Sequence, residues 1–140
     1  MGIKENFKKD LEEWQAVELL FGARMFWLWH RISWPEDWYF PDYDLIVDWI
    51  MYEVKFDRQQ PQTGNVAIEV SYKWKPSWLM RTKAQKIIYY ISDEFWCINT
   101  DKLKELIKDY KVIHWGDNNE SELVLMSTAQ VKKHFTLLFN

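Results

Sequence analysis

The chain has 140 residues, of which 48% are hydrophobic and 28% charged, a balance that predicts one globular domain with a core of its own. A formal net charge of −3 excludes a protein that is basic overall. One cysteine, Cys97, excludes an intramolecular disulfide and favours a reducing compartment. The sequence shows neither an apolar run of membrane-spanning length nor a signal-peptide core, so we expect a cytoplasmic protein with no membrane partner.

The first predicted element is an amphipathic helix over residues 5–22. Leu11, Trp14, Val17 and Phe21 recur there at helical spacing, and Gly22 is expected to end the helix. Residues 23–34 are rich in aromatic side chains, and their periodicity favours neither a helix nor a strand.

Alternating apolar side chains predict a hairpin with strands at 44–48 and 50–56, and a further strand over 66–72 after a polar turn. The rest of the chain is expected to alternate between helix and strand. The expected elements are a helix over 82–91 beginning at Ser77 or Thr82, a strand at 94–99, a helix at 101–111 capped by Thr100, a strand at 123–127 and a helical turn at 127–135. This order predicts a single α/β domain, residues 1–140, with a central mixed sheet flanked by helices.

The hairpin carries the residues with the clearest chemical meaning. Glu53 and Lys55 point to one face of their strand because side chains alternate, and antiparallel pairing would bring Asp44 near Glu53. Paired carboxylates raise each other's pKa unless a cation lies between them, and hard oxygen ligands suit Mg²⁺ or Mn²⁺. A lysine beside them could activate water or stabilise charge on a phosphate. Glu18, on the first helix, could supply another acid.

These residue types are the parts needed for metal-assisted phosphodiester hydrolysis. The alternative is that Asp44 merely begins a strand, while Glu53 and Lys55 form an exposed pair on a hairpin. Residues 71–92 carry five basic residues and no acid, which suits phosphate binding but also describes a solvated basic face. No glycine-rich phosphate loop and no zinc-type spacing occurs in the sequence.

The segment PDYDLIVDWIMYEVKFD, residues 41–57, resembles the signature of the PD-(D/E)XK nuclease superfamily, with Glu53-Val54-Lys55 as its E-x-K element. More narrowly, the chain resembles small phage-encoded endonucleases and Holliday-junction resolvases of that superfamily. Matching pieces such as TGNVAIEVSYKWKPSW and GDNN extend the resemblance over residues 7–119. The resemblance implies the restriction-endonuclease-like core, in the order αβββαβ.

The resemblance also implies roles for individual residues. Asp44 and Glu53 would bind Mg²⁺ or Mn²⁺, with the Val54 carbonyl as a third ligand, Lys55 as the catalytic lysine and Glu18 as the helix acid. Asp42 remains an alternative to Asp44, which is preferred because it directly precedes apolar strand residues.

Glu69 is a secondary candidate, either for the metal site or as a cross-strand partner of a lysine. The residues expected to contact the DNA backbone are Lys73, Lys75, Ser77, Arg81, Thr82 and Lys83.

The expected activity is therefore that of a Mg²⁺-dependent DNA endonuclease, phage-encoded and located in the cytoplasm of a bacterial host. Branched or junction DNA is a plausible substrate, and a homodimer would supply two cuts by symmetry. One alternative is a non-catalytic nucleic-acid-binding module on the same fold. Another is a tryptophan-rich binder of carbohydrate or protein.

Ten tryptophans set this chain apart, and several stand where turn-forming residues or glycine would be expected. These are Trp14, Trp49, Trp74, Trp78 and Trp115. Trp49 lies at the expected hairpin tip, where positive φ favours glycine. Three explanations remain open: the tryptophans stack on bases or a partner, they belong to the core, or a codon read as glycine in the source genome appears here as tryptophan.

Overall fold

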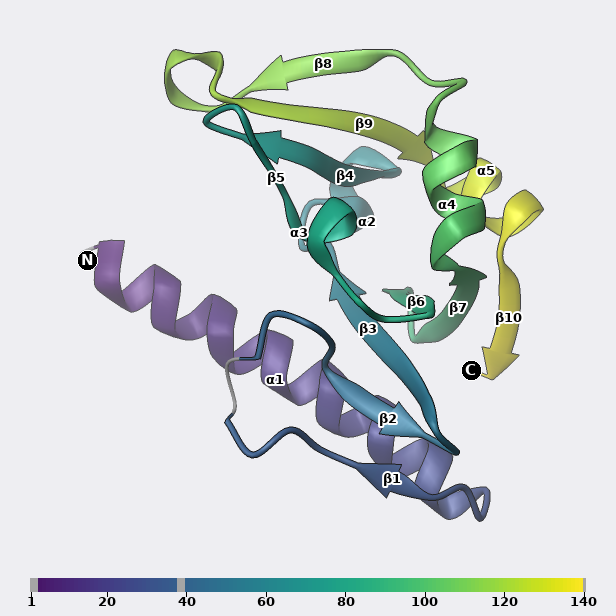
Figure 1. Ribbon diagram of the computed structural model, residues 1–140. Helices are drawn as coiled ribbons and strands as arrows, with labels where there is room; N and C mark the ends of the chain where they lie inside the picture. The colour runs from purple at the N-terminus through teal and green to yellow at the C-terminus, as the bar shows by residue number, and fades with distance from the viewer. Residues whose placement is uncertain (1–2, 38–39, 140) are drawn as a thin grey trace.

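The computed structural model describes residues 3–37 and 40–139 (Figure 1). Its elements, in chain order, are α1 (Ile3–Trp27), β1 (Ile32–Ser33), β2 (Leu45–Val47), β3 (Ile50–Phe56), α2 (Gln60–Thr63), β4 (Asn65–Tyr72), β5 (Lys75–Pro76), α3 (Trp78–Arg81), β6 (Lys86–Ile91), β7 (Glu94–Asn99), α4 (Thr100–Ile107), β8 (Val112–Trp115), the 3₁₀ turn η1 (Asp117–Asn119), β9 (Ser121–Ser127), α5 (Thr128–His134) and β10 (Thr136–Phe139). None of the described helices is both long and apolar enough to cross a membrane.

The larger sheet has six strands in the order β1-β2-β3-β6-β7-β10. The predicted hairpin forms β2 and β3, which pair antiparallel with Leu45 opposite Tyr52. β3 and β6 are parallel, with Glu53 opposite Ile87, and the other neighbouring strands are antiparallel. The sheet is therefore mixed, as the sequence predicted, and β3 lies inside it rather than at an edge.

A second sheet contains four antiparallel strands in the order β5-β4-β9-β8. The strand predicted over 66–72 is present as β4, but it leaves the hairpin and pairs with β9 over most of its length. The expectation of one central sheet is thus only partly correct. The sequence could not show this separation, because alternation defines the faces of a strand and not its partner.

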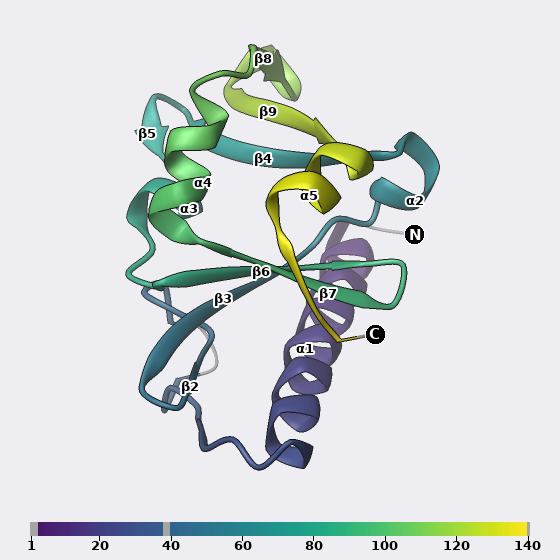
Figure 2. The same cartoon turned by 90° about the vertical axis from the view of Figure 1, so that its right-hand side faces the viewer.

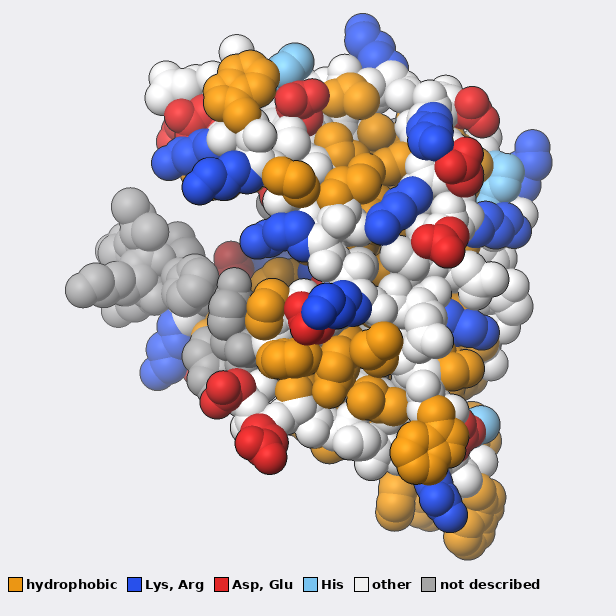
Figure 3. All heavy atoms as spheres, viewed as in Figure 1, with side chains coloured by type: hydrophobic (Ala, Val, Ile, Leu, Met, Phe, Trp, Pro, Cys, Tyr) orange, Lys and Arg blue, Asp and Glu red, His pale blue; other side chains and the backbone are white. Residues whose placement is uncertain are grey.

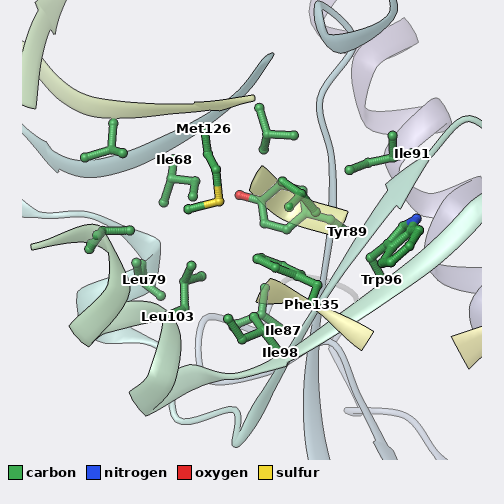
Figure 4. Packing of buried hydrophobic residues seen from close by; sticks show 14 residues of the cluster. Ile68, Leu79, Ile87, Tyr89, Ile91, Trp96, Ile98, Leu103, Met126 and Phe135 are labelled. Carbon is green, nitrogen blue, oxygen red and sulfur yellow. The ribbon is translucent and has the colours of Figure 1, made fainter. Parts of the chain in front are cut away.

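The two sheets and α1 form layers. α1 packs on one face of the six-stranded sheet, and α3, α4 and α5 lie on the other side, toward the four-stranded sheet (Figure 2). One core contains Phe21 of α1 with Tyr52, Val54 and Phe95 of the larger sheet. The other core fills the space between the sheets, where Ile68 and Met126 face Ile87, Tyr89 and Phe135 (Figure 4).

One predicted element has the wrong type, and the predicted end of the first helix is wrong. Residues 82–91 do not form a helix: Lys86–Ile91 is a central strand, in which β-branched and aromatic side chains pack on both faces. Helix α1 does not end at Gly22 but continues to Trp27. Gly22 instead allows Trp34 to approach closely, because a Cβ there would lie 2.5 Å from the indole ring.

Other predictions are confirmed. The strand at 94–99 is β7, the strand at 123–127 lies within β9, and the final helical turn is α5. The helix expected at 101–111 is shorter, since α4 ends at Ile107, and its N-cap is Asn99 rather than Thr100.

Candidate active site

A cavity of about 590 Å³ lies where α1, the segment before β2, β3 and α3 meet. Four acidic residues line it: Asp10, Glu18, Asp44 and Glu53. Asp10 forms an ion pair with Arg58, and we call the space the carboxylate cavity after the other three, which come from distant parts of the chain. Lys55 and Arg81 line the same space. The structure thus brings together the four residues Glu18, Asp44, Glu53 and Lys55 that the sequence analysis singled out, and Val54 lines the cavity with them.

The β2–β3 hairpin determines where Asp44 lies. The Asp44 backbone N–H donates to the Tyr52 carbonyl at 2.9 Å, which extends the antiparallel ladder by one residue. The Asp44 carboxylate then accepts a hydrogen bond from the Val54 backbone N–H at 2.7 Å. Asp44 is therefore held beside Glu53 by the strand itself. Asp42, the alternative acid, forms an ion pair with Lys83 at 3.4 Å and does not line the carboxylate cavity.

Glu53 is buried, with 5% of its surface exposed. Its Oε1 atom lies 3.6 Å from the Lys55 Nζ atom. Its Oε2 atom has no hydrogen-bond partner among the described residues. A buried carboxylate oxygen without a partner is costly to maintain, so it indicates a position that a ligand or ion completes.

The three carboxyl groups hold their protons more tightly than free side chains do. Burial raises the pKa of Glu53 to about 8; Lys55 opposes this shift, while Asp44 adds to it. Burial also raises the pKa of Glu18 to about 8, helped by the charge of Asp44 and opposed by Lys55. The pKa of Asp44 is raised by burial as well, against the effects of Lys55 and the Val54 N–H. Mutually perturbed acids in a cavity are typical of functional sites.

Lys55 lies between two indole rings. Its Nζ atom is 4.3 Å from the ring centroid of Trp78 and 4.9 Å from that of Trp14. Both rings are within range of a cation–π interaction. The sequence analysis did not anticipate this contact, because Trp14 comes from α1 and Trp78 from α3, and only the packing of these helices beside β3 brings them together.

The carboxylate cavity offers a divalent cation two adjacent carboxylates. Asp44 and Glu53 are hard oxygen ligands of the kind that Mg²⁺ and Mn²⁺ prefer, and one oxygen of Glu53 is free to bind. Among the described residues, no group of three His, Cys, Asp or Glu side chains is arranged to hold a metal ion. The side chains therefore fit an ion bound by two carboxylates, with remaining positions left to backbone, water or substrate oxygens.

Glu69 does not line the carboxylate cavity. Its carboxylate accepts hydrogen bonds from the hydroxyls of Ser77 and Ser121, the latter at 3.3 Å. Among the described residues, no lysine forms an ion pair with Glu69, and its predicted metal contact stays a prediction. Ser77 is buried and its hydroxyl donates to Glu69, while its predicted contact with DNA stays a prediction.

Thr82, another predicted DNA contact, is buried as well. Its buried hydroxyl donates to the Asp42 carbonyl at 3.0 Å and accepts from the Ala84 N–H at 3.2 Å, which ties the end of α3 to the segment before β2. The other predicted DNA contacts, Lys73, Lys75, Arg81 and Lys83, are exposed. Figure 3 shows basic side chains on this face from the β4–β5 hairpin toward α4.

Comparisons with known proteins bear on the fold. No protein-family model matches the chain, and no curated protein matches it. Among solved structures, the chain is similar to a bacterial homing endonuclease, I-Ssp6803I, with a TM-score of 0.54 and 15% sequence identity over 87% of this chain and 85% of that one. At this identity the similarity establishes a shared fold, a mixed α/β domain with a central sheet flanked by helices.

Proposed function

We propose that this chain is a metal-dependent DNA endonuclease with a restriction-endonuclease-like core. The observation that carries the proposal is the buried, unpartnered oxygen of Glu53, held beside Asp44 and Lys55 in one cavity. The fold shared with a homing endonuclease supports the same class of activity. The E-x-K spacing on β3 explains why Glu53 and Lys55 share this position.

Asp44 and Glu53 would hold a Mg²⁺ or Mn²⁺ ion, with the Val54 carbonyl as a further ligand. When bound, such an ion supplies Lewis-acid stabilisation of a phosphate and a more acidic bound water. Lys55 lies close enough to Glu53 to orient a water molecule or to stabilise negative charge that develops on the phosphate. Glu18, whose pKa of about 8 leaves it mostly protonated at neutral pH, could donate a hydrogen bond or a proton at the cavity wall.

The proposal is tested by cleavage assays on supercoiled plasmid, linear duplex, single strand and four-way junction, each with Mg²⁺, with Mn²⁺ and with EDTA. We expect metal-dependent cutting, and its loss in Glu53→Ala. The preferred substrate would show whether branched DNA is the target, and sizing of the protein on that DNA would show whether it acts as a dimer. Equal cutting by Glu53→Ala, or by the parent protein in EDTA, would contradict the proposal.

A non-catalytic DNA-binding module is the second candidate, and one observation favours it. The rings of Trp14 and Trp78 lie against Lys55, where a phosphate would otherwise approach. Such a module would bind DNA equally well with Mg²⁺ and with EDTA, and it would cut none of the substrates.

A further inference from the structure

A second cavity, of about 550 Å³, lies on the other side of the segment Arg81–Lys83 from the carboxylate cavity. We call it the lysine pocket, because its lining contains one acid, Asp101, and four lysines: Lys83, Lys86, Lys102 and Lys104. In a chain with a formal net charge of −3, this is a local excess of positive charge.

Three of these lysines are available to a ligand. Lys83 is paired with Asp42, but Lys86, Lys102 and Lys104 form no ion pair within the described part of the chain. The lysines come from the loop after α3, from β6 and from the first turns of α4, so the fold, rather than a run of sequence, gathers them.

The start of α4 adds to this attraction for anions. Its N-cap, Asn99, makes no side-chain cap hydrogen bond among the described residues. Thr100 is buried and anchored, since its N–H donates to the Gln85 carbonyl at 3.0 Å and its hydroxyl to the Ala84 carbonyl at 2.7 Å. The N-terminal end of the helix therefore points its partial positive charge into a fixed wall of the lysine pocket.

The lysine pocket and the carboxylate cavity are joined by continuous structure. Ile50 lines the pocket, and Glu53 lines the cavity three residues later on β3, which is roughly 10 Å along a strand. Phosphates on one strand of duplex DNA follow each other at about 3.4 Å along the axis, so about three of them would cover this distance.

We propose that the lysine pocket binds a backbone phosphate of the same DNA strand, about three phosphates away from the phosphodiester that enters the carboxylate cavity. This inference rests on the proposed function. It assigns a phosphate-binding role to Lys86, Lys102 and Lys104, none of which was among the predicted DNA contacts, although Lys86 lies in the basic segment 71–92. A contact between lysine and a backbone phosphate does not depend on the base, so the pocket would position the strand without selecting a sequence.

The test is the salt dependence of DNA binding without metal, measured for the parent and for the double variant Lys102→Ala/Lys104→Ala. Each phosphate contact contributes about 0.9 to the slope of log K against log salt on duplex DNA, so we expect the slope to fall by about 1 to 2. The matched control, Lys108→Ala/Lys111→Ala, removes the same charge from exposed positions outside the pocket lining and should leave the slope nearly unchanged.

Equal slopes for the two double variants, or no DNA binding by the parent, would overturn the phosphate pocket. Because these measurements exclude metal and detect no cleavage, they are independent of the nuclease proposal. A protein that binds through the pocket but never cuts would retain this inference and lose the proposed activity. If the protein cuts DNA but the two double variants have equal salt slopes, the proposed activity is retained and the phosphate pocket is contradicted.

A second inference comes from the backbone of three exposed tryptophans. Trp49 and Trp74 are the second central residues of two hairpin turns, with φ of 71° and 66° after residues that also have positive φ. Trp29 follows α1 with φ of 69°, and the N–H of His30 donates to the Met25 carbonyl in the manner of a Schellman motif. Glycine is favoured at each of these positions because a side chain resists positive φ.

Burial does not compensate for this strain. The side chains of Trp29, Trp49 and Trp74 are 96%, 82% and 85% exposed, so they do not belong to the core. The whole chain has ten tryptophans and four glycines, the reverse of ordinary usage. We infer that the source organism places glycine at positions 29, 49 and 74, through a codon that it reads as glycine.

Peptide mass spectrometry of the protein isolated from its source tests this inference. Glycine at the three positions is the expected result, and tryptophan there would overturn it. With recombinant protein, Trp49→Gly/Trp74→Gly should melt roughly 3 °C higher per site, since the strain of positive φ is relieved. Trp96→Gly is the matched control and should melt lower, because Trp96 packs in the core without positive φ. No gain for the double variant would also contradict the inference.

Discussion

The carboxylate cavity and the lysine pocket lie on either side of Arg81–Lys83, yet they hold their charges in opposite ways. In the cavity, Glu53 is buried and its charge is countered by Lys55 at 3.6 Å. In the pocket, Lys102 is exposed and surrounded by solvent. Buried charges interact strongly, so the loss of one partner has a large energetic effect. Exposed charges are screened by solvent and salt, so each contributes a small amount to the binding free energy.

Under the proposed function, this contrast separates two tasks. A buried cluster with perturbed pKa values suits chemistry on one bond, and exposed lysines suit reversible attachment to a polyanion. Substitutions in the cavity should therefore change rates by large factors, while substitutions in the pocket should change affinity and its dependence on salt.

The largest expected effect comes from Glu53→Gln. Loss of this carboxylate should lower the rate of DNA cleavage by about 10²–10⁴-fold, because the proposed ion loses a ligand and the phosphate loses the stabilisation that the ion would supply. DNA affinity without metal should change by less than about threefold, since glutamine keeps the shape of the buried side chain. Single-turnover cleavage and metal-free binding measure the two quantities. Glu12→Gln, an exposed acid on α1, is the control and should change neither.

The next largest effect concerns stability and pH. The pKa of Glu53 is about 8 in the folded protein and about 4.5 in an exposed chain, so the folded state binds protons more tightly. Stability from this group is fully present below pH 4.5 and is lost as the pH rises through 8. We expect the free energy of unfolding to fall by a few kcal/mol over this range.

Urea denaturation at pH 5, 7 and 9 measures this dependence. Glu53→Gln should flatten the profile, because the amide does not titrate. Identical pH profiles for the two proteins would show that Glu53 does not govern this dependence.

Divalent cations should reverse the trend at high pH. An ion held by Asp44 and Glu53 binds their ionised forms, so Mg²⁺ or Mn²⁺ should raise the melting temperature more at pH 8 than at pH 5.5. The increase should disappear in Glu53→Gln and persist in Lys102→Ala/Lys104→Ala. The melting temperature is measured without metal and at metal concentrations that increase in 10-fold steps. An equal increase in parent and Glu53→Gln would place the ion elsewhere.

The smallest expected effect concerns the rings beside Lys55. If Trp78 covers the lysine, Trp78→Gly should raise the rate of cleavage several-fold, in line with a cation–π contact of about 0.5–2 kcal/mol, while Trp78→Phe should change it little. Single-turnover rates at saturating protein measure this effect. A lower rate in Trp78→Gly that Trp78→Phe restores would instead show that the ring positions Lys55.

Part of the site could be predicted from the sequence because it is local. Asp44, Glu53 and Lys55 lie on one hairpin, where alternation and antiparallel pairing determine which side chains share a face. Trp49 was recognised as a misfit for the same reason, since the two-residue turn between β2 and β3 requires positive φ. The burial of Ser77 and Thr82 could not be predicted, because it depends on contacts with Glu69 and Asp42 that no local pattern reveals.

By itself, the sequence determined the hairpin, its acids and its lysine, because periodicity and turn chemistry act over a few residues. The tertiary structure alone decided that β4 leaves for a second sheet, that residues 86–91 form a strand beside β3, and that Glu18 reaches the cavity. It also gathered lysines of β6 and α4 into one pocket. These outcomes depend on which apolar faces bury one another across long stretches of chain, and that choice is made by packing of the whole core rather than by local preference.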